Sequence, residues 1–245
     1  MSLLRGLLVT IVLICGFFPL YAQTVDEVIA NHIEAIGGKD AWKKVNSLEV
    51  DGTLTLQGND VSVTLIQLHG KGMRQNISVQ GMVGYQIVTP TAGWTFLPFQ
   101  GQTEVNAMSE EELKQAQNEL DVHGSLLEYA EKGHAAELAG KENIGQTDCF
   151  KIVLKLNSGK VETLYIDSKN YYLVRTVTRQ NVNGQEEDLE TNYSEFEKTP
   201  EGLVIAKAIT LPYGTMAINK VQVNSPVDEN LFKPIYNVEK AAGPR

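Results

Sequence analysis

The sequence is poor in the side chains on which most enzyme chemistry depends. Its 245 residues include only two cysteines, four histidines and two tryptophans. Two cysteines are too few for the disulfide framework of a small secreted scaffold. Basic residues are also scarce, 21 against 30 acidic ones, which gives a net charge of −9. This balance argues against nucleic acid and anionic head groups as partners, because both attract basic patches, so any contact with lipid should be apolar.

Catalytic and metal-binding motifs are missing as well. The histidines, at His32, His69, His123 and His134, do not follow a metal-ligand spacing, and there is no Gly-x-Ser-x-Gly motif. Cys149 has no sequence cue for a partner histidine, which favours a small, partly buried strand residue over a reactive thiol. We therefore expect no enzyme activity, no catalytic or metal-binding residues and no cofactor. A hydrolase of envelope lipids or glycans would need carboxylates or histidines clustered inside a concavity.

The only long hydrophobic run stands at the start of the chain and has the features of a secretory signal. Arg5 precedes an apolar run from Leu7 to Phe18, and Leu20-Tyr21-Ala22 stands before a polar stretch that begins at Gln23. The run is shorter than the roughly 20 residues that span a bilayer. Cys15 does not follow a small residue, which disfavours lipid attachment there. We expect cleavage after Ala22 and export, which leaves 223 residues with one cysteine and a net charge of −10.

A short helix should follow the leader. Thr24 and Glu27 form a capping box, and an apolar stripe runs from Val25 to Ile36 before Gly37-Gly38 ends the helix. From residue 48 onward apolar and polar residues alternate with the period of two that is typical of a strand with one dry face. This alternation recurs along most of the chain, and short turns suited to hairpins separate the runs.

The alternation predicts a mainly β protein of the α+β class. We expect residues 23–245 to form one domain, because no linker or low-complexity run divides them. Its framework would be a curled antiparallel sheet of about eleven strands that forms a half-open barrel. The N-terminal helix and an inserted helical lid would cover the apolar concave face.

The lid is predicted from one insertion near residues 109–133. Ser109 and Glu112 form a second capping box at its start. A further helical piece is expected around Leu126, Leu127 and Tyr129.

Short motifs spread over nearly the whole chain after the leader give a resemblance to a known family. In order they are Gly37-Gly38 followed by Trp42, Asp51-Gly52, Gly84-Tyr85 with Gly93-Trp94 and Pro98-Phe99, Glu131-Lys132-Gly133-His134, Tyr165-Ile166-Asp167, Tyr172-Leu173-Val174, Asn192-Tyr193-Ser194, Gly202-Leu203, Ile209-Thr210-Leu211-Pro212 and Asp228 to Phe232. In these motifs the chain resembles the outer-membrane lipoprotein-sorting family of periplasmic carriers, in particular its more distant members. Most matched residues are turns or packing positions, and none identifies a cargo.

The resemblance implies a half-open antiparallel β-barrel around an apolar cavity that helices close. It also implies a periplasmic carrier that passes the acyl chains of lipoproteins, or other lipids, toward the outer membrane. Donor and acceptor proteins of the inner and outer membranes would load and unload it. Members of the family use an arginine to hold the lid shut; the surroundings of Arg74 do not match the family pattern, so this role is not transferred to it.

Strand parity selects residues for the lipid-binding surface. On the concave face we expect Leu54, Leu56, Val63, Leu65, Ile77, Val79, Tyr85, Ile87, Trp94 and Phe96, and on the lid Leu113, Leu120, Leu126 and Leu127. Burying hydrocarbon is worth about 0.8 kcal/mol per methylene, so a dry cavity would lower the barrier to moving an acyl chain through water. Any one of these residues could instead be ordinary core.

A second interpretation keeps the fold and changes the role. If the helices pack fully into the sheet, the protein would be a non-catalytic cell-envelope scaffold or interaction protein with a fully packed core. An apolar pocket of several hundred cubic ångströms would favour the carrier instead.

Overall fold

The computed structural model describes residues 23–56, 58–182 and 185–236. The predicted leader, up to the expected cleavage after Ala22, lies outside the described residues. Within the described part of the chain, no helix combines the length and the apolar character needed to cross a membrane.

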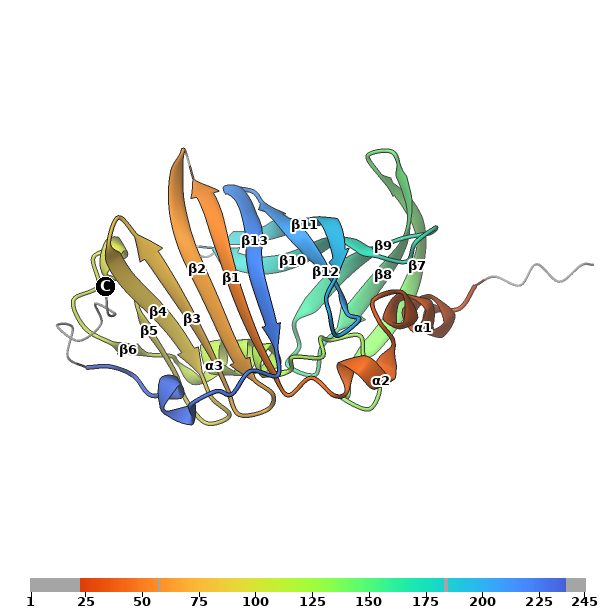
Figure 1. Ribbon diagram of the computed structural model, residues 1–245. Helices are drawn as coiled ribbons and strands as arrows, with labels where there is room; N and C mark the ends of the chain where they lie inside the picture. Colours follow the sequence, from red (N-terminus) through yellow and green to blue (C-terminus); the bar gives the residue numbers. More distant parts are fainter. Residues whose placement is uncertain (1–22, 57, 183–184, 237–245) are drawn as a thin grey trace, which may run out of the picture.

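One antiparallel sheet of thirteen strands forms the framework of the molecule (Figure 1). The strands are β1 (Ser47–Leu56), β2 (Asn59–Leu68), β3 (Gly72–Val79), β4 (Met82–Val88), β5 (Gly93–Phe96), β6 (Asn106–Ala107), β7 (Ala135–Ile144), β8 (Thr147–Lys155), β9 (Val161–Asp167), β10 (Leu173–Val182), β11 (Gln185–Lys198), β12 (Val204–Leu211) and β13 (Gly214–Val223). The first half runs outward from β1 to the edge strand β6. The second half begins at the other edge, β7, and returns to β13, which pairs with β1. The predicted mainly β, open antiparallel architecture is confirmed.

The sheet has two strands more than the eleven predicted. The strand β6 is only two residues long, too short to show an alternation. The edge strand β7 carries a largely polar and exposed sequence, and its pairing with β8 shifts between Leu138 and Lys141. Both strands lack the apolar periodicity by which a half-buried strand is found in a sequence, so the prediction missed them.

The helices begin where the capping boxes predict. The helix α1 (Val25–Ala35) is capped by Thr24, and α3 (Glu110–Ala116) by Ser109, with both reciprocal hydrogen bonds present in each box. The helix α1 is followed by Gly37 and Gly38 at φ of 123° and 87°, a region that favours glycine. The remaining helical turns are α2 (Lys39–Trp42), η1 (Pro98–Gln100), η2 (Gln117–Leu120) and η3 (Glu229–Phe232).

The second half of the insertion is not helical. The prediction of a helix around Leu126, Leu127 and Tyr129 is wrong, because residues 121–134 form a series of turns. Glu128 adopts a left-handed φ of 53°, which an α-helix does not accommodate. Gly133 then ends the segment at φ of 77°.

The core of the second half lies between α1 and the strands β8 and β9. It consists of Val28, Ile29 and Ile33 of α1, Leu126 and Leu127 of the insertion, and Phe150, Ile152, Leu154, Leu156, Leu164 and Ile166 of the sheet region. His32 is buried in the same helix, with Nδ1 2.8 Å from the Tyr171 carbonyl oxygen. Burial lowers the pKa of His32, so the ring is held neutral and donates through Nδ1.

The first half of the sheet is covered on both faces. On one face α3 and η2 place Ala116 and Leu120 against Met73 and Val88. On the other face η3 places Phe232 against a cluster of β4 and β5 residues. In Figure 1, η3 belongs to the C-terminal segment, drawn in blue, that runs back along this half.

A buried arginine holds the C-terminal segment in place. Arg74 of β3 donates from Nη1 to the Leu231 carbonyl oxygen at 3.0 Å and from Nε to Asn76 at 2.8 Å. Its guanidinium lies 4.7 Å from the centre of the Tyr85 ring. In this structure Arg74 therefore contacts η3 rather than the insertion.

The C-terminal segment should contribute strongly to stability through Phe232. Replacing Phe232 by alanine is expected to lower the free energy of unfolding by about 3 kcal/mol, because the ring is 5% exposed and leaves a cavity against β3 and β4. Urea unfolding measures the change. The neighbouring Leu231 is 37% exposed, so Leu231→Ala should cost less than about 1 kcal/mol. Equal losses in the two variants would contradict the packing of η3 described above.

Candidate functional site

A hollow of about 1350 Å³ lies beside α3. Its walls are formed by Gln86, Thr95, Gln102, Asn106, Ala107, Met108, Glu111, Glu112, Gln115, Ala116, Glu119, Gly159, Lys160, Val161, Thr163, Val177, Arg179 and Asp188. These residues come from β4–β6 in one half of the sheet and β9–β11 in the other, with α3 and η2 between them. The hollow is therefore bordered by both halves of the molecule.

Polar side chains dominate the walls of this hollow. Amide, hydroxyl and carboxylate groups outnumber the few apolar residues, of which Met108, Val161 and Val177 are the largest. Glu112 is fixed by the capping box, and its hydrogen bonds with Ser109 hold its pKa below the ordinary value. The hollow is thus not the dry apolar cavity expected from the sequence; it suits water or the polar part of a ligand.

An apolar strip lies on the face of the sheet that α3 covers, across its central strands. In register order it contains Val61, Leu54, Met216, Ile209 and Tyr193, which are paired in succession from β2 to β11. Directly paired residues point to the same side of a sheet, so these five side chains form one row. Val61 is buried and the other four are half-buried.

A second row lies beside the first. Ile77 pairs with Val63, Val63 with Gly52, and Gly52 with Ile218. Gly52 stands at an irregularity in the ladder, where a Cβ atom would lie only 3.1 Å from the Ala217 carbonyl oxygen and the Met216 side chain. The two rows together are the apolar strip of the following sections.

The structure distributes the predicted lipid-binding residues over several places. None of them lines the polar hollow. Leu54, Val63 and Ile77 belong to the apolar strip, Leu65 packs with Leu113 and Leu120 of the insertion, and Leu56 and Val79 are half-buried at strand ends. Leu126 and Leu127 lie in the core under α1. Their role in binding lipid stays a prediction.

Four of the predicted concave residues lie on the opposite face. Tyr85, Ile87, Trp94 and Phe96 form two direct pairs and pack under η3, whereas their neighbours Gln86 and Thr95 line the hollow. Their assignment to the concave face is corrected accordingly. Because α3 and η3 cover both faces of these strands, apolar residues do not mark the cavity side here.

Met216, Ile209, Tyr193 and Ile218 were not predicted as site residues. The signal was present in part, since apolar residues recur at every second position from Ile205 to Leu211, interrupted by Lys207. Only the pairing of β1 with β13 brings them beside Leu54, and strands so far apart in sequence do not reveal their pairing.

A smaller groove of about 370 Å³ runs between α1 and the insertion. Its floor is apolar, formed by Ile29, Ala30, Ile33, Leu126 and Leu127, and charged residues stand at its rim. At the rim Glu128 accepts from Lys39 at 2.8 Å and from Lys43 at 2.6 Å. These contacts lower the pKa of Glu128 to about 2.

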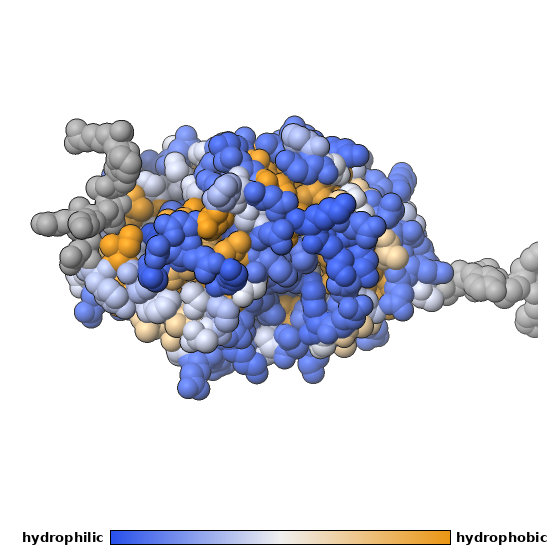
Figure 2. Space-filling model, turned by 60° about the horizontal axis from the view of Figure 1, so that its bottom comes forward, coloured by the Kyte–Doolittle hydropathy of each residue, from blue (hydrophilic) through white to orange (hydrophobic). Residues whose placement is uncertain are grey.

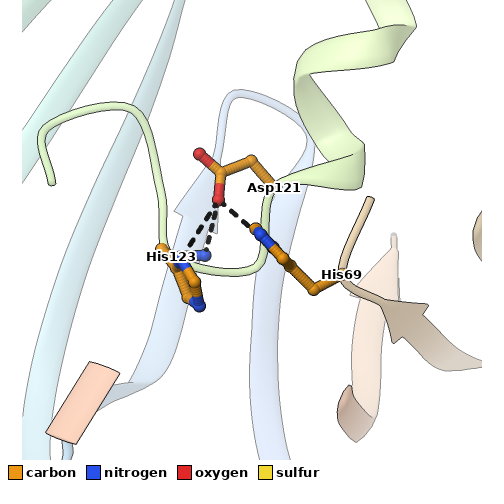
Figure 3. Close-up of side chains that lie close together, drawn as sticks. All are labelled: His69, Asp121 and His123. Carbon is orange, nitrogen blue, oxygen red and sulfur yellow. Dashed lines mark hydrogen bonds and ion pairs between the residues drawn. The ribbon is translucent and has the colours of Figure 1, made fainter. Parts of the chain in front are cut away.

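Two histidines and an aspartate meet beside this part of the insertion (Figure 3). Asp121 Oδ1 lies 3.5 Å from Nδ1 of His69 and 3.8 Å from Nδ1 of His123. The imidazole rings are stacked with centroids 4.1 Å apart. Burial and the neighbouring His123 lower the pKa of His69. Sequence spacing did not reveal this cluster, because His69 belongs to the turn after β2 and the other two follow η2.

The ion pairs of Glu128 should make the stability of the protein depend on pH. A carboxylate whose folded pKa is lowered stabilises the fold above its ordinary pKa of 4.5, and this contribution is lost as the pH falls toward 2. Wild type should therefore be more stable than Glu128→Gln at pH 7, and the difference should vanish near pH 2. Thermal unfolding at several pH values measures this.

The exposed Glu34 at the same rim serves as the control. Glu34→Gln should not reproduce the pH-dependent loss. A stability difference between wild type and Glu128→Gln that does not change with pH would contradict the ion-pair assignment.

Comparisons with known proteins identify solved structures that have a similar fold. No family model and no curated protein matches the chain. A LolA superfamily protein from Nitrosomonas europaea matches with a TM-score of 0.58 and 12% identity over 86% of this chain and 99% of the other. A DUF1329 family protein from Desulfovibrio piger matches with a TM-score of 0.55 and 13% identity, over 86% and 98%.

A third structure is described as an outer membrane lipoprotein-sorting protein domain, from Vibrio parahaemolyticus. It matches with a TM-score of 0.52 and 13% identity, over 89% of this chain and 98% of the other. The resemblance that the sequence motifs indicated is thereby confirmed at the level of the fold: this chain has the fold of LolA superfamily proteins.

Proposed function

We propose that the protein is an exported carrier that binds the acyl chains of lipoproteins or of other lipids in the periplasm and passes them toward the outer membrane. The observation that carries this proposal is the apolar strip on the α3-covered face of the sheet. One of the solved structures with the same fold, reported above, is described as a lipoprotein-sorting domain, and this supports the same role. Binding and release would be its whole mechanism, with no chemical step.

The exposure of the strip is that of a surface able to bind an apolar ligand. Leu54, Met216, Ile209 and Ile77 are half-buried rather than sealed into a core. An extended acyl chain laid along them would lose its own contact with water and remove theirs. About fifteen methylenes at about 0.8 kcal/mol each amount to roughly 12 kcal/mol of hydrocarbon burial, which is the barrier that a carrier removes.

The polar hollow would accommodate the other end of such a molecule. Gln86 and Thr95 lie on the same face of the sheet as the strip, as the register from β1 through β5 shows. A lipid or lipopeptide is apolar at one end and carries esters, amides or hydroxyls at the other. The amide and hydroxyl groups of the hollow match that polar end, because they can donate and accept hydrogen bonds.

The helix α3 stands where a lid is needed. It is seven residues long, and its charged first turn is exposed while Ala116 is buried against the sheet. So short a helix is held by its packing rather than by its own stability. Displacing it would uncover Leu65 and Met73 and extend the apolar surface toward β3. The lid would open at a donor or acceptor membrane protein.

The face shown in Figure 2 fits a carrier that moves between membranes without inserting. On the face shown in Figure 2, hydrophobic residues form small patches between hydrophilic ones. A carrier of this kind hides apolar surface inside and presents a polar exterior.

One observation favours the scaffold as the second candidate. The apolar residues of α1, α3 and η3 pack into clusters with buried members, and the hollow beside α3 is mainly polar. A protein whose apolar faces are all satisfied by its own helices would need no lipid. Whether a lipid is bound to the apolar strip in the native protein distinguishes the two functions.

The intact mass of protein purified from its native envelope tests the carrier function. Measured under non-denaturing conditions and again after organic extraction, it should fall by the mass of a lipid or lipopeptide. A bare mass before extraction, in a protein that also fails to take up a fluorescent fatty acid, would move the assignment to the scaffold.

A charge in the strip should weaken lipid binding strongly without unfolding the sheet. Ile77→Glu places a carboxylate among the apolar side chains, which should weaken binding of a fluorescent fatty acid at least about tenfold, equivalent to about 1.4 kcal/mol. The adjacent Ser78 is also half-buried but points to the other face, so Ser78→Glu is the matched control. Circular dichroism checks that both variants fold. Equal affinity in the two variants would exclude the strip as the binding surface.

A further inference from the structure

We propose that His69, Asp121 and His123 form a binding site for a divalent transition-metal ion, best matched by Zn²⁺. This proposal does not rest on the carrier function. One nitrogen of each imidazole and one carboxylate oxygen lie within 4.8 Å of one another. Figure 3 shows the three side chains converging from two different segments of the chain.

The distances are close to those of a tetrahedral site. With bonds of about 2.0–2.1 Å, two ligand atoms around Zn²⁺ stand roughly 3.3–3.4 Å apart. Asp121 Oδ1 is 3.5 Å from Nδ1 of His69 and 3.8 Å from Nδ1 of His123. The two imidazole rings are stacked with centroids 4.1 Å apart, so one ring must rotate about its side-chain bonds before both Nδ1 lone pairs point at one ion. Three protein ligands would leave the fourth position to water or to a ligand group.

The hydrogen bonds of His123 set the tautomer that ligation needs. Its Nε2 lies 3.0 Å from the Val45 carbonyl oxygen, which can only accept, so Nε2 carries the proton. Nδ1 is then the nitrogen available to a metal ion, and it lies 3.8 Å from Asp121 Oδ1. A metal-ligating histidine commonly donates its other ring nitrogen to a backbone carbonyl in this way. The His123 amide also donates to Asp121 Oδ1 at 3.0 Å and orients the carboxylate.

The backbone on both sides of the cluster is held in position. The His69 amide donates to the Asn46 carbonyl oxygen at 2.8 Å, and the Gly70 amide donates to the Leu120 carbonyl oxygen at 2.9 Å. The second bond joins the turn after β2 directly to the end of η2, one residue before Asp121. The site is thus built on segments that are already fixed to each other. An ion bound there would pin the start of the turn segment 121–134 to the sheet.

The set of ligands selects the class of metal. Two imidazoles and one carboxylate suit Zn²⁺ and its neighbours in the first transition row, whereas Ca²⁺ and Mg²⁺ prefer oxygen ligands. Lys132 forms an ion pair with the other carboxylate oxygen, Oδ2, and leaves Oδ1 to face the histidines. Its charge opposes the binding of a cation, so we expect moderate rather than extreme affinity. The His69 side chain is 39% exposed, which gives an ion access from solvent.

Titration of the full chain, prepared without a histidine tag, with Zn²⁺ against a chromophoric chelator tests the site. We expect one ion per chain. His69→Gln and His123→Gln should each weaken binding at least about tenfold, because losing a ligand costs no less than losing an outer-shell partner. His134→Gln removes another partly exposed histidine, leaves all three proposed ligands in place, and should change the affinity far less than the loss of a ligand.

Two further measurements separate ligation from adventitious binding. The Co²⁺-loaded protein should show the visible absorption of a tetrahedral site, and this signal should be lost in Asp121→Asn. Hydrogen exchange of the amides in residues 121–134 should slow when Zn²⁺ is added to wild type and not when it is added to His69→Gln. Equal Zn²⁺ affinity in wild type and His69→Gln, or the absence of 1:1 binding, would overturn the proposal.

Discussion

The pairing of β1 with β13 is the interaction on which the rest of the structure depends. It joins Leu48 to Val223 and Leu54 to Met216, residues from opposite ends of the described chain. Without it the strands β1–β6 and β7–β13 would form two separate antiparallel sheets. With it, thirteen strands become one open sheet, and the apolar strip spans the junction. The irregularity at Gly52 lies in this ladder, where a Cβ atom would lie only 3.1 Å from the Ala217 carbonyl oxygen.

The sequence predicts those parts of the fold that local physics determines. Both capping boxes are found where Thr24 and Ser109 indicate them, because a cap is formed within four residues. Alternation identifies eleven of the thirteen strands and fails at β6 and β7, which are too short or too polar to carry it. It also fails to say which face of β4 and β5 is concave. The helix α3 covers one face of these strands and η3 covers the other. Apolar residues therefore occur on both faces, and their alternation does not distinguish the concave face from the convex one.

The candidate sites depend on distant contacts and could be predicted only in part. Leu54, Val63 and Ile77 of the apolar strip follow from parity, whereas Ile209 and Met216 enter it through strands paired across the chain. The histidine cluster is the extreme case. Its side chains are brought together by a hydrogen bond between the turn after β2 and the end of η2, which no spacing rule encodes.

The distribution of polarity explains why a sheet of this kind would be left open. A closed barrel filled by its own side chains has no place for a ligand, and an open apolar face in water would aggregate. In this protein, the two ends of the α3-covered face of the sheet differ in polarity. The apolar strip lies over the junction of the halves, the polar hollow beside α3, and a helix of only seven residues covers Met73 and Val88 on the same face. A face that is apolar in one part and polar in the next is complementary to an amphiphilic molecule rather than to hydrocarbon alone. In the proposed carrier, weak local stability of the covering helix would allow such a molecule to enter and leave without unfolding the sheet, because α3 is not part of any strand ladder.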